Sequence, residues 1–181
     1  MEQYFIQFSL LILFLPLGAF LVQIFFGKRI PRDGDWVSIG AILITLILSF
    51  VMFFSMLSRY DPGLSKDASF TWIDMGSFSI KLGFLVDNIT IIMLLIVSLI
   101  STCTHIFSLK YMAGDIRYSR YYAYLGLFTF SMNGIILSNN LLGIYIFWEL
   151  VGLSSYLLIG FWFEKESAAN ATSLANSVIP S

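Results

Sequence analysis

Charged side chains are scarce in this sequence. They make up 12% of its 181 residues, whereas soluble domains carry roughly 25%. Hydrophobic residues make up 58%, which is more apolar surface than a soluble chain of this length can hide. The composition therefore excludes a soluble globular domain, and it predicts that lipid or a large partner covers the apolar surface.

Several residue types that build functional sites are also scarce or missing. The net charge is only −1 and no basic run is present, which excludes a nucleic-acid-binding surface. Cys103 is the single cysteine, so the chain has no disulfide framework and no cysteine cluster for a metal. It also has no glycine-rich nucleotide loop and no pair of histidines suited to haem. We expect no cofactor and no metal in this chain.

What the sequence does have is five long apolar runs that are nearly free of charge. Each is close to the length that crosses a hydrocarbon core of about 30 Å at about 1.5 Å per residue. The runs are 3–26, 36–57, 88–109, 121–138 and 141–163. The first lacks the basic start and the cleavage site of a signal peptide, so we interpret it as a retained span. The sequence predicts an all-α integral membrane protein, one domain over residues 1–181, with about five transmembrane helices.

One long polar segment, residues 58–87, separates the second run from the third. Large apolar residues alternate with small or polar ones in two stretches of it, 70–72 and 78–84. The residues Asp74 to Ser77 between them, with Gly76, favour a turn. We therefore predict a small extracytoplasmic β-hairpin. An irregular amphipathic loop is the alternative, because a lone hairpin is marginal unless it packs on something.

Basic residues gather in two of the connecting loops. They follow the first and third runs, and they are Lys28, Arg29, Arg32, Lys110, Arg117 and Arg120. Short loops rich in Lys and Arg stay in the cytoplasm. We therefore expect these two loops to be cytoplasmic, with the hairpin and the tight Asn139-Asn140 turn on the outside.

Glu149 is the one acidic residue that lies well inside an apolar run. A carboxylate at the bilayer centre costs on the order of 3 kcal/mol on insertion scales, so it should face protein or water rather than lipid. Intramembrane acids of this kind commonly carry protons, and we hypothesise that Glu149 is a proton carrier. The alternative is a structural ion pair. No Lys or Arg lies within the runs, so a partner must come from elsewhere.

His105 is the second candidate, about one turn before Lys110 in the third run. An imidazole titrates near neutral pH, so His105 could relay protons. An interfacial or hydrogen-bonded structural histidine is the competing interpretation. Other polar residues within the runs, Thr102, Thr104, Ser131 and Asn133, are expected to make ordinary contacts between helices.

Four stretches of the sequence carry a family resemblance. They are LVDNIT at 85–90, THIFSLKYM at 104–112, YSRYYAYLGLFTFSM at 118–132 and NNLLGIYIFWELVGLSSYLLIGFWFEK at 139–165. They closely resemble the subunit L (mitochondrial subunit 5) family of respiratory complex I, the NADH:quinone oxidoreductase. The resemblance covers nearly the whole chain, and WELVGLSSYLLIGFW is its most specific part.

The resemblance implies an antiporter-like subunit that moves protons while distant subunits pass electrons from NADH to quinone. Glu149 matches the family's proton-path glutamate, and His105 matches a histidine common at that place. NADH, FMN, iron–sulfur clusters and quinone would then belong to partner subunits. The direct partners would be lipid and other membrane-arm subunits. The bacterial cytoplasmic membrane is expected ahead of the mitochondrial inner membrane.

Two departures from the family pattern keep other interpretations open. Leu150 stands where many members have glycine, and the tail TSLANSVIPS replaces a motif of the type KAF-x-x-NR-x-GD. The tail is typical of a truncation or a frameshift, and it predicts that this chain alone cannot form a complete proton channel. The alternatives are the large subunit of a multi-subunit cation/proton antiporter and a truncated fragment that does not translocate protons.

Overall fold

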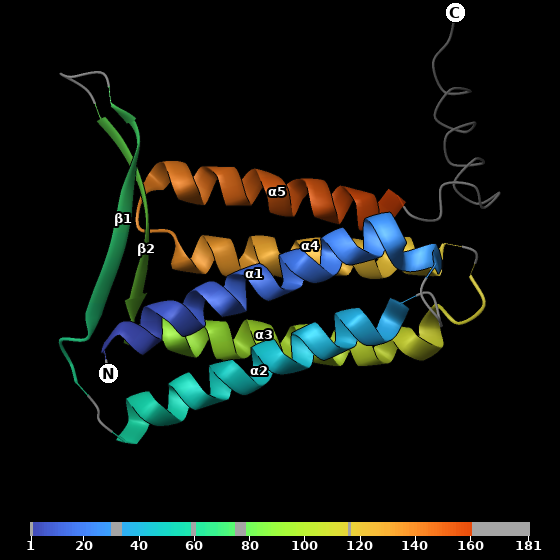
Figure 1. The fold of residues 1–181 in the computed structure, drawn as a ribbon, viewed down its shortest axis with the longest axis horizontal. Helices are drawn as coiled ribbons and strands as arrows, with labels where there is room; N and C mark the ends of the chain where they lie inside the picture. Colours follow the sequence, from blue (N-terminus) through green and yellow to red (C-terminus); the bar gives the residue numbers. More distant parts are fainter. Residues whose placement is uncertain (1, 30–33, 59–60, 75–78, 116, 161–181) are drawn as a thin grey trace, which may run out of the picture.

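The computed structural model describes residues 2–29, 34–58, 61–74, 79–115 and 117–160. Within these ranges five long helices lie side by side, and a two-stranded sheet crosses one end of the bundle (Figure 1). The helices are α1 (Glu2–Phe26), α2 (Asp35–Ser58), α3 (Asn88–Tyr111), α4 (Tyr118–Leu137) and α5 (Leu141–Ile159), with a short 3-10 turn η1 (Gly27–Arg29) after α1. The predicted helices are confirmed, with most bounds shifted by one to three residues. The predicted end of the fifth run, 161–163, lies outside the described residues.

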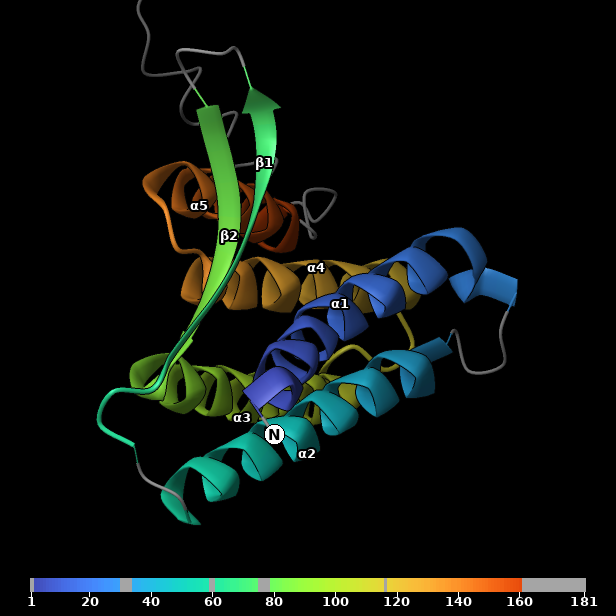
Figure 2. The same cartoon turned by 60° about the vertical axis from the view of Figure 1, so that its left-hand side comes forward.

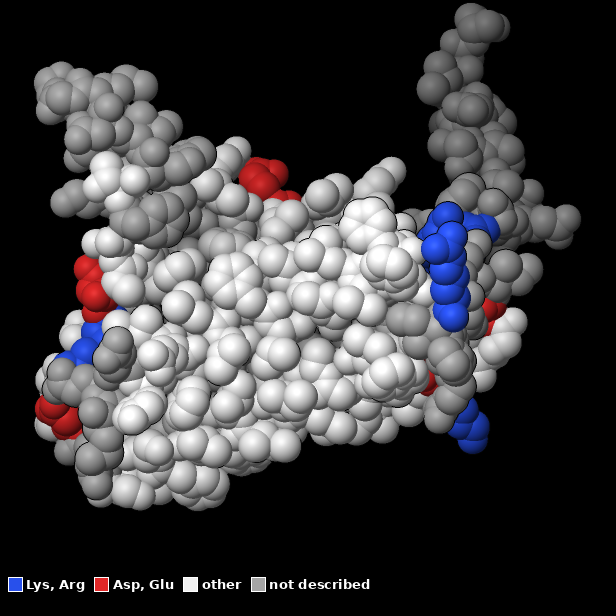
Figure 3. Space-filling view, in the orientation of Figure 1, with Lys and Arg blue, Asp and Glu red and all other residues white. Residues whose placement is uncertain are grey.

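Four of these helices, α1, α2, α3 and α5, are long and apolar enough to cross a membrane. The charged side chains gather at the two ends of the bundle and leave the side between them almost uncharged (Figure 3). A hydrocarbon layer fits around such an uncharged band. The chain is therefore a multi-pass membrane protein of the all-α class.

The fifth helix, α4, is long enough to span but is less apolar than the others. Its position gives the reason, since α1, α3 and α5 all pack against it (Figures 1 and 2). Eleven of its 20 residues are buried, against two of 19 in α5. A helix surrounded by other helices can carry serine, threonine and asparagine, because these side chains meet hydrogen-bond partners rather than lipid.

Small residues allow α4 to approach both of its large neighbours closely. A Cβ atom on Gly126 would lie 3.1 Å from the carbonyl oxygen of Pro16 in α1. A Cβ atom on Gly134 would lie 2.2 Å from the ring of Phe147 in α5, which is closer than any side chain tolerates. Gly152 and Gly160 of the α5 region make no such approach, because no described atom lies within 4 Å of a Cβ atom placed on either.

Two side chains cap the helices that follow the loops at the hairpin end of the bundle. Asp87 accepts a hydrogen bond from the backbone N–H of Thr90 (2.7 Å) at the start of α3. Asn140 does the same for Gly143 (2.7 Å) at the start of α5. Each side chain satisfies a backbone donor that a helix leaves unpaired in its first turn.

The predicted hairpin is confirmed as strands β1 (Ser65–Asp74) and β2 (Ser79–Asp87), paired antiparallel. Its expected turn falls largely on 75–78, outside the described residues. The hairpin rests on the bundle through Asn139, whose amide donates to the carboxylate of Asp67 (2.7 Å) and whose N–H donates to the carbonyl of Gly83 (3.1 Å). A lone hairpin is only marginally stable, but these two bonds attach this hairpin to the helix bundle.

Candidate functional site

Glu149 lies near the middle of α5, and its side chain is exposed in the described part of the chain. The helix turns by about 100° per residue, so Glu149 points roughly opposite to Phe147, two residues earlier. Phe147 faces inward, where its ring meets Phe130 of α4 edge to face with centroids 5.6 Å apart. The packing of Phe147 thus turns the carboxylate away from the bundle.

The surroundings of Glu149 on α5 are apolar and exposed. Trp148 is 66% exposed, Tyr145 61% and Tyr156 73%, and among the described residues none covers this face. A carboxylate in such a band is costly against lipid and needs protein or water beside it. We therefore expect protein or water beside this face of α5.

His105 takes the opposite kind of position, fully buried with 0% exposure. Its Nδ1 donates to the carbonyl oxygen of Ser101, one turn earlier, at 2.8 Å. In a neutral ring this bond leaves Nε2 as the acceptor nitrogen, and Nε2 is buried without a hydrogen-bond partner among the described residues. The hydroxyl of Tyr122 in α4 donates to the backbone carbonyl of His105 (2.9 Å) rather than to its ring.

A row of buried hydroxyl groups continues from His105 along α3. Ser101 shares a hydrogen bond of 2.7 Å with Thr129 of α4, and Ser98 shares one of 2.9 Å with Ser49 of α2. These two pairs join α3 to both neighbours. In the sequence, the presence of serine and threonine within apolar runs is the signal for these pairs, and it does not distinguish them from other hydroxyl residues.

The polar residues that the sequence did single out behave differently from one another. Asn133 bridges two helices, since its side-chain amide donates to the carbonyl of Ile12. The hydroxyls of Thr102, Thr104 and Ser131 instead bond to carbonyls of their own helices, four residues earlier. Of these four bonds, only the one from Asn133 joins two helices.

A second polar cluster closes the end of the bundle opposite the hairpin. The side chain of Gln23 in α1 donates to the carbonyl of Gly34 (2.5 Å) and the hydroxyl of Ser38 (3.1 Å), and it accepts from Ser119 of α4 (2.9 Å). One glutamine thereby ties α1 to α2 and α4. Its amide has enough donors and acceptors for all three bonds.

The structure does not bring the two candidate proton residues together. His105 lies between α3 and α4, Glu149 lies on the outer face of α5, and α4 runs between α3 and α5 (Figures 1 and 2). The described residues also contain no group of three or more His, Cys, Asp or Glu that could hold a metal ion.

Two family profiles match the chain. The profile described as "NADH-Ubiquinone oxidoreductase (complex I), chain 5 N-terminus" matches residues 72–122, a range that contains His105. The profile described as "NADH:quinone oxidoreductase/Mrp antiporter, TM" matches residues 138–178, a range that contains Glu149.

Whole-protein comparisons give the same family. NAD(P)H-quinone oxidoreductase subunit 5 of Cryptomeria japonica chloroplasts is 42% identical over 91% of this chain and 23% of the relative. F(420)H(2) dehydrogenase subunit L of Methanosarcina mazei is 40% identical over 93% of this chain and 24% of the relative. NADH-quinone oxidoreductase subunit L of Neisseria meningitidis is 37% identical over 90% and 24%. The chain spans about a quarter of the length of these relatives.

The fold has a counterpart among solved structures. A chain of the membrane-bound sulfane sulfur reductase, an archaeal respiratory membrane complex, superposes with a TM-score of 0.71 over 91% of this chain and 32% of that one. At 16% identity this likeness shows the fold alone. The sequence matches carry the assignment: this chain belongs to the subunit 5/subunit L family of NADH:quinone oxidoreductases, and it contains a part of that subunit.

Proposed function

We propose that the chain is part of a proton-translocating, antiporter-like membrane subunit of a respiratory NADH:quinone oxidoreductase, and that Glu149 carries protons in it. The observation that supports this role most directly is an acidic side chain in the middle of a spanning helix. It lies within the range that matches the antiporter profile. The family assignment is the basis for proposing proton translocation, and Glu149 is the titratable group that would carry the proton.

His105 enters the proposal as a proton relay. Its buried Nε2 can accept a proton, and the hydroxyl pair Ser101–Thr129 lies beside it on the same stretch of α3 and α4. Since α4 separates His105 from Glu149, the two residues would act in different parts of a path rather than as a bonded pair.

The electron-transfer chemistry belongs to partner subunits in this proposal. NADH, FMN, iron–sulfur clusters and quinone would bind there, and this chain would contact other membrane-arm subunits and lipid. The relatives include chloroplast, archaeal and bacterial proteins. We propose the bacterial cytoplasmic membrane as the location.

The test uses a full-length host, because the chain spans about a quarter of its relatives. Residues 1–160 replace the matching segment of the Neisseria meningitidis subunit L, and Glu149→Gln is introduced into this chimera. Glutamine keeps the size and hydrogen bonding of the side chain but cannot release a proton. We expect proton pumping in sealed vesicles to fall by at least about tenfold. Assembly of the complex should stay normal.

The matched variant is Glu149→Asp, which keeps the acid and shortens the side chain by one bond of about 1.5 Å. It should pump better than Glu149→Gln. If Glu149→Gln pumps normally in an assembled complex, Glu149 is a structural residue and the proton-carrier role is wrong.

A cation/proton antiporter is the second candidate, because the profile that matches 138–178 is shared with Mrp antiporters. The two functions differ in what drives proton movement. Vesicles that carry the subunit would exchange Na⁺ for protons without any electron donor if the antiporter assignment holds. Proton movement that depends on NADH supports the respiratory assignment instead.

A further inference from the structure

Ser101 carries a hydroxyl that behaves differently from its neighbours in α3. Four hydroxyls around it donate to the carbonyl oxygen four residues earlier in the helix, and they belong to Ser98, Thr102, Thr104 and Ser108. Among the described residues Ser101 makes no bond of this kind. Its Oγ lies 2.7 Å from Oγ1 of Thr129 in α4 and 3.4 Å from Nδ1 of His105. Ser101 therefore connects α4 to the single histidine of the chain.

The acceptors around these groups fix where their hydrogens lie. A carbonyl oxygen can only accept, so Nδ1 of His105, at 2.8 Å from the Ser101 carbonyl, carries a hydrogen. The Thr129 hydroxyl has one hydrogen, and the carbonyl of Leu125 accepts it at 3.0 Å. The oxygen of Thr129 is then an acceptor for the hydrogen of Ser101. With its hydrogen turned to Thr129, Ser101 Oγ presents only lone pairs to Nδ1.

The reverse arrangement of these hydrogens is unfavourable. Ser101 could donate to Nδ1 only if this nitrogen carried a lone pair. That lone pair would then face the oxygen of the Ser101 carbonyl, so two acceptors would meet at 2.8 Å. The side chains of Ser101, His105 and Thr129 are all buried, and a buried group that loses its partner pays the full cost of desolvation. The hydroxyl of Thr129 therefore keeps a competing donor away from Nδ1.

A second donor near the imidazole is also engaged elsewhere. The rings of Tyr122 and His105 have their centroids 5.8 Å apart, yet the Tyr122 hydroxyl donates to the backbone carbonyl of His105 at 2.9 Å. Nε2 has no partner among the described residues. In its neutral form the ring thus holds its hydrogen on Nδ1 and a lone pair on Nε2.

We propose that Thr129 is a positioning residue for His105, because its hydroxyl holds the hydrogen of Ser101 away from Nδ1 and so keeps the ring in the Nδ1–H tautomer. The Ser101 carbonyl sets this tautomer, and Thr129 protects it from the neighbouring helix. The consequence for function rests on the proposed relay role of His105: a proton would enter and leave the ring at Nε2 alone. Thr129 itself would carry no proton.

The test reads the tautomer directly by solid-state NMR. The full chain is labelled with ¹⁵N-histidine, purified with a tag free of histidine and reconstituted in lipid bilayers. Because the chain has one histidine, both ring signals belong to His105, and a nitrogen that carries a hydrogen resonates far from one that carries a lone pair. We expect the unmodified chain at neutral pH to show the hydrogen on Nδ1 and the lone pair on Nε2.

Thr129→Val keeps the shape of the side chain and removes the hydroxyl. The buried Ser101 hydrogen can then reach Nδ1 by rotation of the hydroxyl alone. The ratio of the Nδ1–H to the Nε2–H tautomer should therefore fall by about tenfold, the equivalent of one buried hydrogen bond. Thr129→Ser retains the hydroxyl and should keep the ratio of the unmodified chain. In Ser101→Ala no competing donor remains, so the addition of Thr129→Val should not change the ratio.

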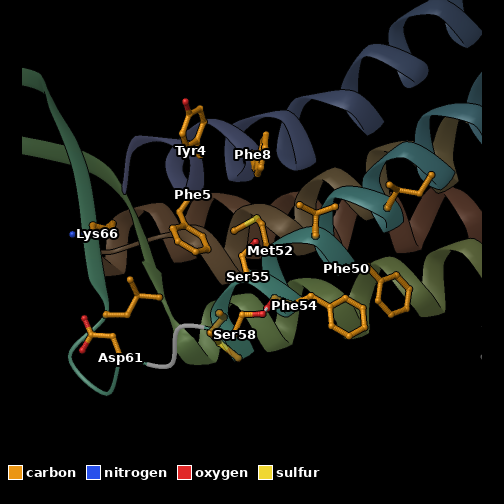
Figure 4. A pocket seen from close by; sticks show the side chains of 14 residues that line it. Tyr4, Phe5, Phe8, Phe50, Met52, Phe54, Ser55, Ser58, Asp61 and Lys66 are labelled. Atoms are coloured by element: carbon orange, nitrogen blue, oxygen red, sulfur yellow. Dashed lines mark hydrogen bonds between the residues drawn. The ribbon is translucent and has the colours of Figure 1, made fainter. Parts of the chain in front are cut away.

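The other hydroxyl pair of α3 provides the matched control. Ser98 shares a hydrogen bond of 2.9 Å with Ser49 of α2. Ser49 lies about one turn before Met52, which lines an open groove between α1 and α2 at the hairpin end of the bundle (Figure 4). Ser49→Ala breaks a bond between two helices, as Thr129→Val does, but it should leave the tautomer ratio unchanged. Circular dichroism of every variant checks that the helices are intact.

Three results would overturn the positioning role. A lone pair on Nδ1 in the unmodified chain would refute the assignment of the hydrogens. An unchanged ratio in Thr129→Val would show that Ser101 turns to a carbonyl of its own helix instead. A shift of equal size in Ser49→Ala would assign the effect to helix packing in general. Failure of the relay would appear differently, as normal pumping by His105→Gln in the full-length chimera, and it would leave every tautomer result unchanged.

Discussion

The side-chain amide of Asn133 in α4 donates a hydrogen bond to the carbonyl oxygen of Ile12 in α1, across 3.3 Å. Pro16 explains why this carbonyl needs a partner, because proline has no N–H to donate to the residue four positions earlier. Both Asn133 and Ile12 are fully buried. A proline that would weaken a spanning helix is therefore accommodated by a polar side chain from the helix beside it.

The first prediction tests this compensation. Asn133→Leu keeps the number and branching of the side-chain heavy atoms and leaves the Ile12 carbonyl unpaired, which should destabilise the bundle by about 1 kcal/mol. Pro16→Ala restores a helical N–H for that carbonyl, so Asn133→Leu should cost less in this background. Unfolding in sodium dodecyl sulfate, followed by circular dichroism, gives the four stabilities of the cycle. If Asn133→Leu lowers the stability equally in both backgrounds, the hydrogen bond from Asn133 does not compensate for the N–H that Pro16 lacks.

The second prediction concerns the contact of α4 with α5. Gly134→Ala places a methyl group 2.2 Å from the ring of Phe147, which cannot retreat easily because it also packs on Phe130. We expect a loss of about 1–3 kcal/mol in the same unfolding assay. Gly152→Ala is the matched control, since no described atom lies within 4 Å of the added methyl. It should be neutral or slightly stabilising, because alanine favours helix.

The third prediction concerns orientation. In a Cys103→Ser background, Ser69→Cys in β1 should react with an impermeant maleimide added outside, and Ala113→Cys after α3 only once the membrane is opened. Both positions are exposed. Gly114 is a poorer choice than Ala113, because its φ of +87° strains any other residue. Reaction in the reverse order would invert the orientation that the basic loops predict.

The sequence predicted the helices and the hairpin well because both signals are local. Charge interrupts the spans, and alternation of apolar and polar residues marks β1 and β2. The anchorage of the hairpin was not predictable, since the bond from Asn139 to Asp67 joins residues 72 positions apart. No local pattern specifies which turn a strand will rest on.

The candidate site was also predictable from the sequence only in part. Position within the apolar runs singled out Glu149 and His105, because each is the one residue of its kind there, and the family resemblance pointed to the same two residues. Their surroundings depend on how the helices rotate, which sequence periodicity did not reveal. Phe147 packs inward and turns Glu149 outward, whereas Ser101 and Tyr122 enclose His105. The pairs Ser49–Ser98 and Ser101–Thr129 were missed, because serine and threonine are common in spans for other reasons.

The last prediction separates a relay histidine from a structural one, in the same full-length chimera that tests Glu149. The imidazole of His105 donates from Nδ1 to the Ser101 carbonyl, and its Nε2 has no hydrogen-bond partner among the described residues. His105→Gln can keep a donor to that carbonyl but cannot accept and release a proton, so pumping should fall by at least about tenfold. Tyr122→Phe removes only the bond to the His105 backbone carbonyl, and it should leave pumping within about twofold while lowering stability by about 1 kcal/mol. A structural histidine would give the opposite pattern, in which His105→Gln lowers stability and the assembled complex still pumps at the full rate per NADH oxidised.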